Sequence, residues 1–473
     1  MKFNEQRTKI VATIGPSSND HEILTNLIKA GVSCCRVNFS HGTEESHKQV
    51  YDLARQVSKE LDIPMSLMLD TKGPEIRIGK MKNDACMIEK DAYINIYTDA
   101  KSHKNLIGDE NNITVSYEMD KDVYPGVKVL LDDGKLVTEV KEVTKNKIVV
   151  KSLNSHLLKT NKRVNIPGID FSLPFMSEKD INDIEWGAKY GIDIIAASFV
   201  NSAENVNEIR NLLKKLGKEN IQICSKIESK KGIDNIDEII EASDSIMVAR
   251  GDLGLEIPYY DVPYYEKKII RKCRLAGKQV IVATQMLDSM EKSPLPTRAE
   301  VTDVYYAVEL GADATMLSGE SASGQYPVEA VKTMAKIAQR AEAEYYNELF
   351  YNEQLKTIAK NASSRSKIAY EVAKKLKDGK FKFAVILSHT GELLKEISTY
   401  RPNAFIAGIV SDNKLVNKYG ITSGIFCEQH SEKIRLMIKE NHDNGRIALE
   451  RFNIKKGDNF IVVDSLNITE HIY

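Results

Sequence analysis

Features of secreted, membrane-bound and zinc-binding chains are scarce in this sequence. Its six cysteines show no repeated spacing and no CxxC motif, which excludes the patterns typical of a disulfide framework or a structural zinc site. We therefore expect reduced, mostly buried thiols and a cytoplasmic location. No apolar run approaches the roughly 20 residues that a membrane-spanning helix needs. Charged and polar residues fill much of the first nine positions, so we expect neither a signal peptide nor a membrane partner.

An excess of charge of either sign is also absent. Lys and Arg total 66 and Asp and Glu total 67, which gives a formal net charge of -1. A balanced chain offers no reason to expect nucleic acid or an anionic membrane as its main partner. The length of 473 residues exceeds what one compact core usually holds, so we expect two or three domains.

Short apolar or β-branched runs, each ending on a polar residue or glycine, are the most regular feature of the sequence. Their nearly continuous apolarity is typical of parallel strands that are buried on both faces. Most are separated by amphipathic stretches of helical length, several of which end in glycine. This repeat favours an α/β fold of the closed (β/α)8 TIM barrel type, with chemistry at the carboxyl ends of the strands. A doubly wound open sheet is the alternative. The runs are TKIVATIG (8–15), CCRVNFS (34–40), MSLMLDT (65–71), IDIIAASF (192–199), IQICSKIE (221–228), SIMVARGD (245–252), QVIVATQ (279–285) and DATMLSGE (313–320).

The third and fourth runs are too far apart to be joined by one helix. Residues 72–164 between them contain segments of alternating polarity and carry Asp133-Gly134, which is typical of hairpin turns. We predict that they form a small inserted β-barrel domain, which acts as a lid because it leaves from the catalytic end of the barrel. Residues 1–71 and 165–340 then form the barrel itself.

Residues 341–473 mix helical and strand-like runs and are predicted to form a C-terminal α/β domain for regulation or subunit contacts. The expected helices fall near 335–350 and 363–376. The expected strands are 381–388, 404–410, 424–428 and 459–465.

Two of the runs end in a carboxylate that follows a basic residue by two positions. The pairs are Lys226 with Glu228 and Arg250 with Asp252. Residues two apart on a strand point to the same face, so each segment is expected to offer a cation for a phosphate beside an anion for a metal. Two carboxylates with room for substrate oxygens suit Mg²⁺ or Mn²⁺ and phosphoryl transfer. A structural salt bridge is the alternative for Lys226 and Glu228.

Polar groups also end the second and third runs. Arg36, Asn38 and Ser40 alternate along one strand face, and Asp70 with Thr71 ends the next run. Inward-facing polar groups are unfavourable unless a ligand, an ion or one another satisfies them. Their oxygen atoms suit a hard cation. The alternatives are an internal hydrogen-bond network and, for Asp70, a helix cap.

The order of short motifs along the chain resembles the pyruvate kinase family. The motifs are KIVATIGPSS, RVNFSHG, LDTKGPEIR, SEKD, ASFV, SKIE, ARGDLGLEIP, TQMLDSM, PTRAEVTDV and MLSGESA. They cover residues 9–330 densely and continue more weakly as YRPNAFIAG. The resemblance implies a barrel, a lid and a C-terminal α/β domain, usually in a homotetramer. It also implies a glycolytic phosphotransferase that converts phosphoenolpyruvate and ADP to pyruvate and ATP with a divalent metal and potassium.

Carried over residue by residue, the family pattern gives each candidate a role. Glu228 and Asp252 are expected to bind Mg²⁺ or Mn²⁺, and Lys226 with Arg36 to neutralise the migrating phosphoryl group. The substrate carboxylate is expected at Gly251, Asp252 and Thr284, and Thr284 with water is expected to donate the proton to the enolate. Potassium is expected to bind Asn38, Ser40, Asp70 and Thr71, and Glu75 marks potassium-dependent members of the family. The nucleotide is expected to contact Thr13, Pro16, His41 and Arg77.

The sequence departs from the family pattern at several positions. Asn201-Ser202 replaces a basic pair near the nucleotide phosphates, which we expect to weaken ADP binding. Lys231 stands at a usually acidic position, with no consequence that we derive. In SHTGELL (388–394), Glu392 and Leu393 replace residues that are usually basic or hydroxyl-bearing, and a carboxylate repels a phosphate. The tail also lacks a glycine-rich loop, so we expect fructose 1,6-bisphosphate to be a poor activator or none.

Two other interpretations compete with a kinase. A lyase or decarboxylase acting on a 2-oxo acid would need the metal carboxylates but not ADP, so dependence of turnover on ADP separates the two. A catalytically silent sensor or scaffold should have lost Lys226, Glu228 or Asp252, and the sequence retains all three.

Overall fold

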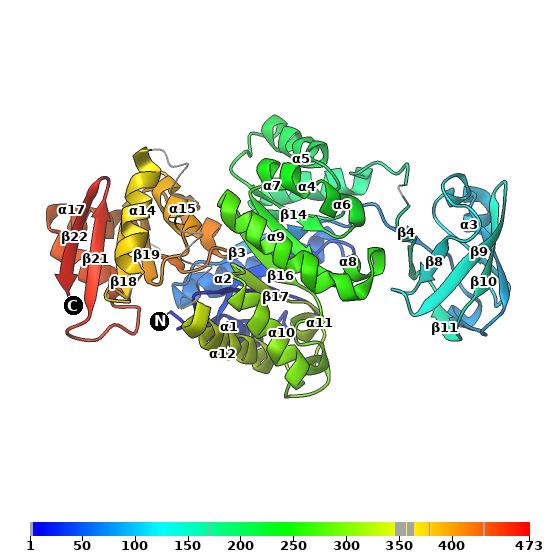
Figure 1. Cartoon of the computed structure of the whole chain (residues 1–473), viewed down its shortest axis with the longest axis horizontal. Coiled ribbons are helices and arrows are strands. Elements are labelled where there is room, and N and C mark those ends of the chain that lie inside the picture. The colour runs from blue at the N-terminus through cyan, green and yellow to red at the C-terminus, as the bar shows by residue number, and fades with distance from the viewer. Residues whose placement is uncertain (1–2, 170, 346–355, 357–363, 378, 429–430) are drawn as a thin grey trace.

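Eight parallel strands close into a barrel at the centre of the molecule, which confirms the predicted (β/α)8 fold and excludes the open sheet (Figure 1). The computed structural model describes residues 3–169, 171–345, 356, 364–377, 379–428 and 431–473. Around the barrel the strand order is β1-β17-β16-β15-β14-β13-β3-β2. The strands are β1 (Lys9–Thr13), β2 (Val32–Asn38), β3 (Ser66–Asp70), β13 (Ile194–Ala197), β14 (Gln222–Ile227), β15 (Ser245–Ala249), β16 (Gln279–Ala283) and β17 (Ala314–Leu317).

Helices surround the barrel and bury its outer face. Side chains such as Val11, Met68 and Met247 fill the barrel interior, whereas Ile10 and Leu67 pack outward against the helices. Each strand therefore has two buried faces, which explains its continuous apolarity. The helices are α1 (His21–Ala30), α2 (Glu44–Leu61), α4 (Glu178–Tyr190), α5 (Ala203–Lys215), α6 (Lys230–Asp234), α7 (Ile236–Ala242), α8 (Arg250–Glu256), α9 (Val262–Ala276), α10 (Arg298–Glu309), α11 (Gly319–Ala322) and α12 (Pro327–Tyr345).

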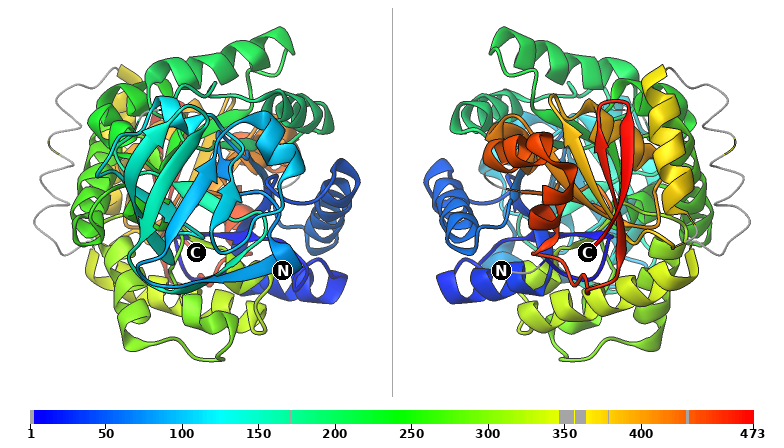
Figure 2. Two further views of the ribbon diagram at one scale, coloured as in Figure 1. Left: turned by 90° about the vertical axis from the view of Figure 1, so that its right-hand side faces the viewer. Right: turned by 90° about the vertical axis from the view of Figure 1, so that its left-hand side faces the viewer.

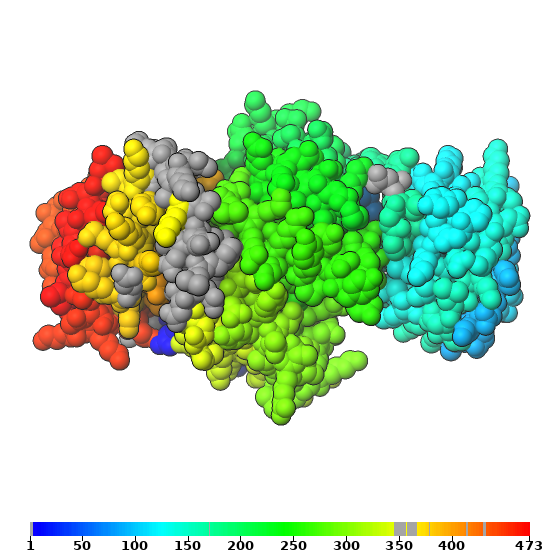
Figure 3. Space-filling model, in the orientation of Figure 1, coloured from blue at the N-terminus to red at the C-terminus, as the bar shows by residue number. Residues whose placement is uncertain are grey.

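The insertion between β3 and β13 forms a small β-barrel over one end of the large barrel (Figure 2). Seven strands bond in the order β4-β12-β8-β9-β10-β6-β7, and a bridge between Ile78 and Val115 joins the two edges. The predicted turn connects β8 with β9, where Asp132, Asp133 and Gly134 have φ of 52°, 54° and 80°. This lid stands out from the rest of the molecule (Figure 3). Its elements are β4 (Ile76–Arg77), β5 (Ala85–Ile88), β6 (Tyr93–Tyr97), α3 (Ala100–Asn105), β7 (Asn112–Thr114), β8 (Lys128–Leu131), β9 (Leu136–Thr144), β10 (Lys147–Ser152), β11 (His156–Lys159) and β12 (Arg163–Asn165).

At the opposite end of the barrel lies a five-stranded sheet in the order β20-β19-β18-β21-β22 (Figure 2). Side chains of β18 alternate between two apolar clusters, one on each face, so helices cover both faces. Its elements are α14 (Ser364–Leu376), β18 (Phe383–Ser388), α15 (Glu392–Thr399), β19 (Phe405–Val410), α16 (Asn413–Val416), β20 (Ile425–Cys427), α17 (Ser431–Glu440), α18 (Gly445–Leu449), β21 (Asn459–Asp464) and β22 (Asn467–Ile472).

The four predicted strands of this C-terminal part are present, but β22 was missed. It pairs antiparallel with β21 at the edge of the sheet. None of its residues is buried, so they give no apolar run to detect. The helix predicted at 363–376 corresponds to α14, whereas the one predicted at 335–350 is seen only as the end of α12, because its remainder lies outside the described residues.

The predicted domain boundaries stay predictions. The lid strand β12 runs to Asn165, and Ile166 belongs to the apolar core of the lid, just past the predicted end at 164. The six cysteines are free thiols, and all but Cys86 are buried, as predicted. Among the described residues, no helix has the length and apolarity that a membrane crossing requires.

Candidate active site

A buried cluster of opposite charges lies at the carboxyl ends of the barrel strands, on the side of the lid. Lys226 Nζ donates to Asp70 Oδ1 (3.0 Å) and Ser198 Oγ (2.8 Å) and lies 3.0 Å from Glu228 Oε1. Arg36 Nε donates to Asp70 Oδ2 (2.6 Å). None of the four charged residues is more than 8% exposed. The strand-end residues predicted from period-2 alternation are thus brought together.

Charge pairing outweighs burial for two members of this cluster. Burial alone raises the pKa of a carboxyl group, but Arg36 and Lys226 lower the pKa of Asp70 below its ordinary value. Burial lowers the pKa of a lysine, but Asp70 and Glu228 raise the pKa of Lys226 above its ordinary value. Lys226 is therefore an ammonium at neutral pH and able to neutralise an anionic ligand.

Glu228 and Asp252 form an interacting acid pair beside Lys226. Burial raises the pKa of Glu228 to about 7; Lys226 opposes this rise and Asp252 adds to it. Burial also acts to raise the pKa of Asp252, but Arg163, Lys226 and a hydrogen bond with Glu228 lower it below its ordinary value. Two neighbouring acids that titrate this differently would both be stabilised as carboxylates by a divalent cation.

The donor set fits Mg²⁺ or Mn²⁺ better than zinc. In the described part of the chain, no three His, Cys, Asp or Glu side chains are grouped as a metal site. Two carboxylates leave positions for substrate oxygens and water, as Mg²⁺ prefers, whereas a closed zinc site needs four protein ligands. Phe199 N–H donates to Glu228 Oε2 (2.7 Å) and so fixes one of the two carboxyl groups.

Arg250 does not join the site, and the expectation that it lies on the same face as Asp252 is wrong. Helix α8 begins at Arg250, so the two-residue alternation of β15 ends before it. The Arg250 guanidinium donates to Asp303 (2.6 Å), Glu266 (3.3 Å) and the Thr284 carbonyl (2.8 Å). Arg250 therefore supports the loop after β16 and contributes no cation to the cluster.

Thr284 directly follows β16 and has a left-handed backbone conformation, with φ of 69°. Its Oγ1 accepts a hydrogen bond from Gly251 N–H (2.7 Å) and donates one to the Ala283 carbonyl (2.6 Å). Thr284 and Gly251 therefore lie together beside Asp252, as predicted. Any anion bound at this turn would have to share or replace the hydrogen bond that joins them.

The same fold and motifs occur in known proteins. The family model described as the barrel domain of pyruvate kinase matches residues 5–331. The chain belongs to the pyruvate kinase family. It is 42% identical over 464 residues to the pyruvate kinase of Mycoplasma genitalium, covering 89% of each chain. It is 40% identical over 460 residues to that of Clostridium acetobutylicum, covering 97% of this chain and 95% of the relative.

A crystal structure of a pyruvate kinase from Cryptosporidium parvum has the same architecture. It superimposes with a TM-score of 0.87 at 34% identity and covers 99% of this chain and 96% of its own. The resemblance of the sequence motifs is therefore confirmed, and with it the assignment of the chain as an enzyme of the pyruvate kinase family.

The residues that the family pattern assigns to potassium lie at the ends of β2 and β3. Asn38 is the register neighbour of Asp70. Asn38 Oδ1 accepts from Ser40 N–H (3.0 Å), and Thr71 Oγ1 accepts from Ser198 N–H (3.0 Å). Their oxygen atoms suit potassium in kind, but the Asp70 carboxylate is already shared by two cationic side chains.

The residues that the family pattern assigns to the nucleotide are spread over the rim of the barrel and the lid. Pro16 and His41 are exposed, and Arg77 belongs to β4 of the lid. Thr13 is different, because it is buried and its hydroxyl accepts a hydrogen bond from Arg36 Nη1 (2.7 Å). Thr13 therefore helps to hold the charged cluster.

Two residues at the site were missed. Ser198, which follows β13, bonds both Lys226 and Asp70, and its place after an apolar run was a usable signal. Arg163 comes from the lid strand β12 and pairs with Asp252, and no local pattern indicates a contact across this distance in sequence.

The departures from the family pattern are also ordered by hydrogen bonds. Asn201 accepts from the Ser229 hydroxyl through its side chain and from Asn235 Nδ2 (2.8 Å) through its carbonyl. At the end of β18, Ser388 Oγ accepts from Leu393 N–H in α15 (3.2 Å). Glu392, the first residue of α15, is exposed.

Proposed function

We propose that this enzyme transfers the phosphoryl group of phosphoenolpyruvate to ADP and releases pyruvate and ATP. The observation that carries the proposal is Lys226, an ammonium held between Asp70 and Glu228 at the mouth of the barrel. Phosphoryl transfer depends mainly on placement and charge neutralisation, because charge spreads over the oxygens of the migrating group.

Each part of the site then has a task. Glu228 and Asp252 would hold Mg²⁺ or Mn²⁺, which supplies Lewis-acid charge next to the reacting phosphate. Lys226 and Arg36 neutralise the phosphoryl oxygens, and their shared contact with Asp70 keeps both side chains in fixed positions.

The substrate carboxylate is assigned to the turn made by Gly251, Asp252 and Thr284. Backbone N–H groups at the start of α8 favour an anion, although this helix is short. The Thr284 hydroxyl, with water, is the group that we assign to deliver a proton to the enolate carbon.

The monovalent and nucleotide sites complete the proposal. Asn38, Ser40, Asp70 and Thr71 are assigned to potassium. Thr13, Pro16, His41 and Arg77 are assigned to ADP and ATP. Glu75 is the residue that marks potassium dependence in the family pattern. Asn201 in place of a cation is expected to weaken ADP binding.

The deciding experiment is a coupled assay of pyruvate formation from phosphoenolpyruvate. We expect turnover that requires ADP and Mg²⁺ and falls at least about tenfold when potassium is replaced by a large organic cation. Pyruvate release without ADP would instead indicate a phosphatase, in which water accepts the phosphoryl group. Equal rates with and without potassium would remove the potassium assignment and leave the kinase assignment intact.

A homotetramer of cytoplasmic location completes the proposal, on family expectation. Light scattering after size-exclusion chromatography tests the assembly, and a monomer mass at micromolar concentration would contradict it. Fractionation of cells with an antibody to the native chain tests the location.

A further inference from the structure

Arg163 links the lid to the candidate metal site. It begins β12, the last strand of the lid, and its Nη1 donates to Asp252 Oδ1 in α8. Its side chain is only 13% exposed, compared with 23% for Asp252. The ion pair is thus largely shielded from solvent. A shielded charge pair is much stronger than one at the surface, because water and salt screen it less.

Arg163 has other groups nearby, besides Asp252, that can contact its guanidinium. Its guanidinium carbon lies 4.9 Å from the centroid of the Phe199 ring, and its Nε lies 4.0 Å from Glu75 Oε1. Burial acts to lower the pKa of Arg163, but Asp252, Glu228 and Glu75 raise it above its ordinary value. Its Nη2 is buried and finds no acceptor among the described residues, so the group is not fully satisfied.

Other lid contacts reach the same helix. The Asn165 side chain lies close enough to Glu256, at the end of α8, to lower the pKa of that carboxyl group against the effect of burial. A side-chain carbon placed on Gly134, in the lid turn, would come within 2.9 Å of Leu255. The lid therefore docks on α8, and the Arg163–Asp252 pair is the charged contact of this docking surface.

We infer that Arg163 is a positioning residue that competes with the divalent cation for Asp252 and so couples metal binding to the position of the lid. The inference rests on the proposed function, because it assigns the metal to Glu228 and Asp252. Mg²⁺ demands close, nearly octahedral oxygen ligands, and a guanidinium on the same carboxylate repels it. Metal binding must therefore move Arg163 off Asp252 Oδ1, which loosens the charged contact between lid and barrel.

The test is the affinity for Mn²⁺ alone, measured from the paramagnetic resonance signal of the free ion in a titration of the full chain without substrates. We expect Arg163→Gln to bind Mn²⁺ at least about tenfold more tightly than the wild type, since hydrogen bonds to charged groups contribute a comparable factor. Arg163→Lys, which keeps the charge but loses the fork, is expected to lie between them. Lys162→Gln is the matched control, because it removes the same charge from the adjacent residue, whose partner is Asp132, and it should leave the affinity unchanged.

The lid provides a second readout. Hydrogen exchange of α8 and β12 is expected to rise when Mn²⁺ is added to the wild type, and to be high from the start and unchanged by Mn²⁺ in Arg163→Gln. This measurement does not depend on turnover, and circular dichroism confirms that each variant is folded.

A Glu228→Gln variant distinguishes failure of the role of Arg163 from failure of the proposed metal site. Unchanged or weaker Mn²⁺ binding in Arg163→Gln, with binding lost in Glu228→Gln, would overturn the role of Arg163 and leave the proposed metal site intact. Normal Mn²⁺ binding in Glu228→Gln would overturn the metal site, and the role of Arg163 with it.

Discussion

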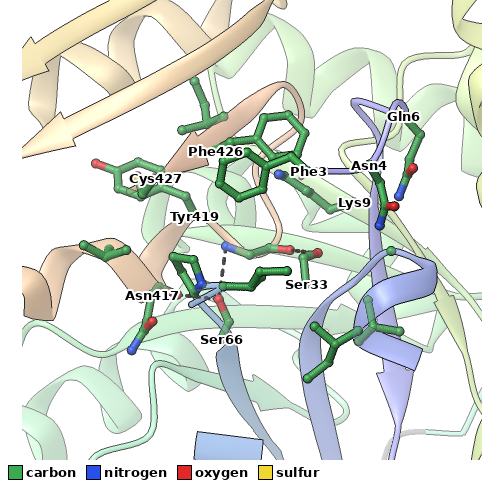
Figure 4. A pocket seen from close by; sticks show the side chains of 18 residues that line it. Phe3, Asn4, Gln6, Lys9, Ser33, Ser66, Asn417, Tyr419, Phe426 and Cys427 are labelled. Carbon is green, nitrogen blue, oxygen red and sulfur yellow. Dashed lines mark hydrogen bonds between the residues drawn. The ribbon is translucent and has the colours of Figure 1, made fainter. Parts of the chain in front are cut away.

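The barrel buries a lysine at each end, and the pKa values of the two lysines are shifted in opposite directions. Lys226 lies at the carboxyl end of β14, where Asp70 and Glu228 each lie 3.0 Å from its Nζ. Lys9 begins β1 at the other end, where its Nζ lies 3.5 Å from the centroid of the Phe426 ring. Figure 4 shows Lys9 among the side chains that line a cavity of about 60 Å³ between the barrel and the C-terminal sheet.

The difference lies in the partners and not in the burial. Lys9 is 5% exposed and Lys226 7%. Burial lowers the pKa of Lys9 to about 7, with Cys427 and Glu342 opposing it too weakly. No described carboxylate pairs with Lys9 within 4.0 Å. A buried lysine is therefore a reliable cation only where carboxylates accompany it, and the active-site end of the barrel supplies them.

The largest effect is expected from removing the active-site lysine. Lys226→Met should reduce kcat at least about a thousandfold, because the phosphoryl oxygens lose a fixed positive charge. Lys9→Met is the matched control, since it deletes an equally buried lysine from the same barrel, and its kcat should stay within about twofold of the wild type. Steady-state kinetics with circular dichroism measure both. Near-normal turnover in Lys226→Met would remove its role.

A similar pair of carboxylates sharpens the comparison. Asp70→Asn should lower kcat/KM about a hundredfold, because Lys226 and Arg36 lose the carboxylate that orients both of them. Asp313→Asn is its control: Asp313 is buried at the opposite end, accepts from Val280 N–H (2.9 Å) and pairs with Arg401. We expect Asp313→Asn to lower the thermal midpoint and to leave kcat/KM nearly unchanged. Equal losses of kcat/KM in both variants would indicate a general structural effect.

The lowered pKa of Lys9 should make the stability of the protein depend on pH. Between about pH 7 and 10.5 the unfolded lysine holds a proton that the folded one lacks, so this group destabilises the fold increasingly as pH falls through that window. Lys9→Met should therefore be more stable than the wild type, by roughly 2–4 kcal/mol at pH 7 and less than about 1 kcal/mol at pH 10.

Urea unfolding at pH 7, 8.5 and 10 measures this difference. The exposed Lys456 provides a control, because Lys456→Met removes a lysine that remains accessible to water in the folded protein. A stability difference for Lys9→Met that does not change with pH would show that Lys9 stays protonated, like Lys226.

The smallest effect is expected at the start of α15, where an acidic side chain stands in place of a basic or hydroxyl-bearing one. Glu392 brings a carboxylate to a position at which a phosphorylated effector would require a cation. Fructose 1,6-bisphosphate should therefore change the half-saturating phosphoenolpyruvate concentration less than about twofold. Glu392→Thr is the matched variant that removes the repulsion. A strong decrease of that concentration in the wild type would contradict the expectation.

Sequence reasoning succeeded where neighbours in sequence decide the outcome. The apolar runs specified the eight barrel strands, since strands buried on both faces must be continuously apolar. The length between Asp70 and Ile194 specified an insertion, and Asp133-Gly134 its turn. The spacing of Lys226 and Glu228 placed them on one face, because β14 extends to Ile227, the residue between them.

Sequence reasoning was wrong or incomplete where a local pattern ended or where burial gave no apolar pattern. Two-residue alternation was wrong for Arg250, because the chain turns into α8 at that residue. The edge strand β22 was missed because it buries too little apolar surface to show a pattern.

What the sequence by itself determined is therefore the barrel, its insertion and the residue types at the strand ends, since these follow from composition and period. The order of its short motifs added the resemblance to the family. Only the tertiary structure decided which charges meet. It brought Arg163 to Asp252 across the lid, and it gave Lys226 two carboxylates and Lys9 an aromatic ring. The reason is physical: burial and partners, set by contacts between distant segments, fix the charge of a side chain.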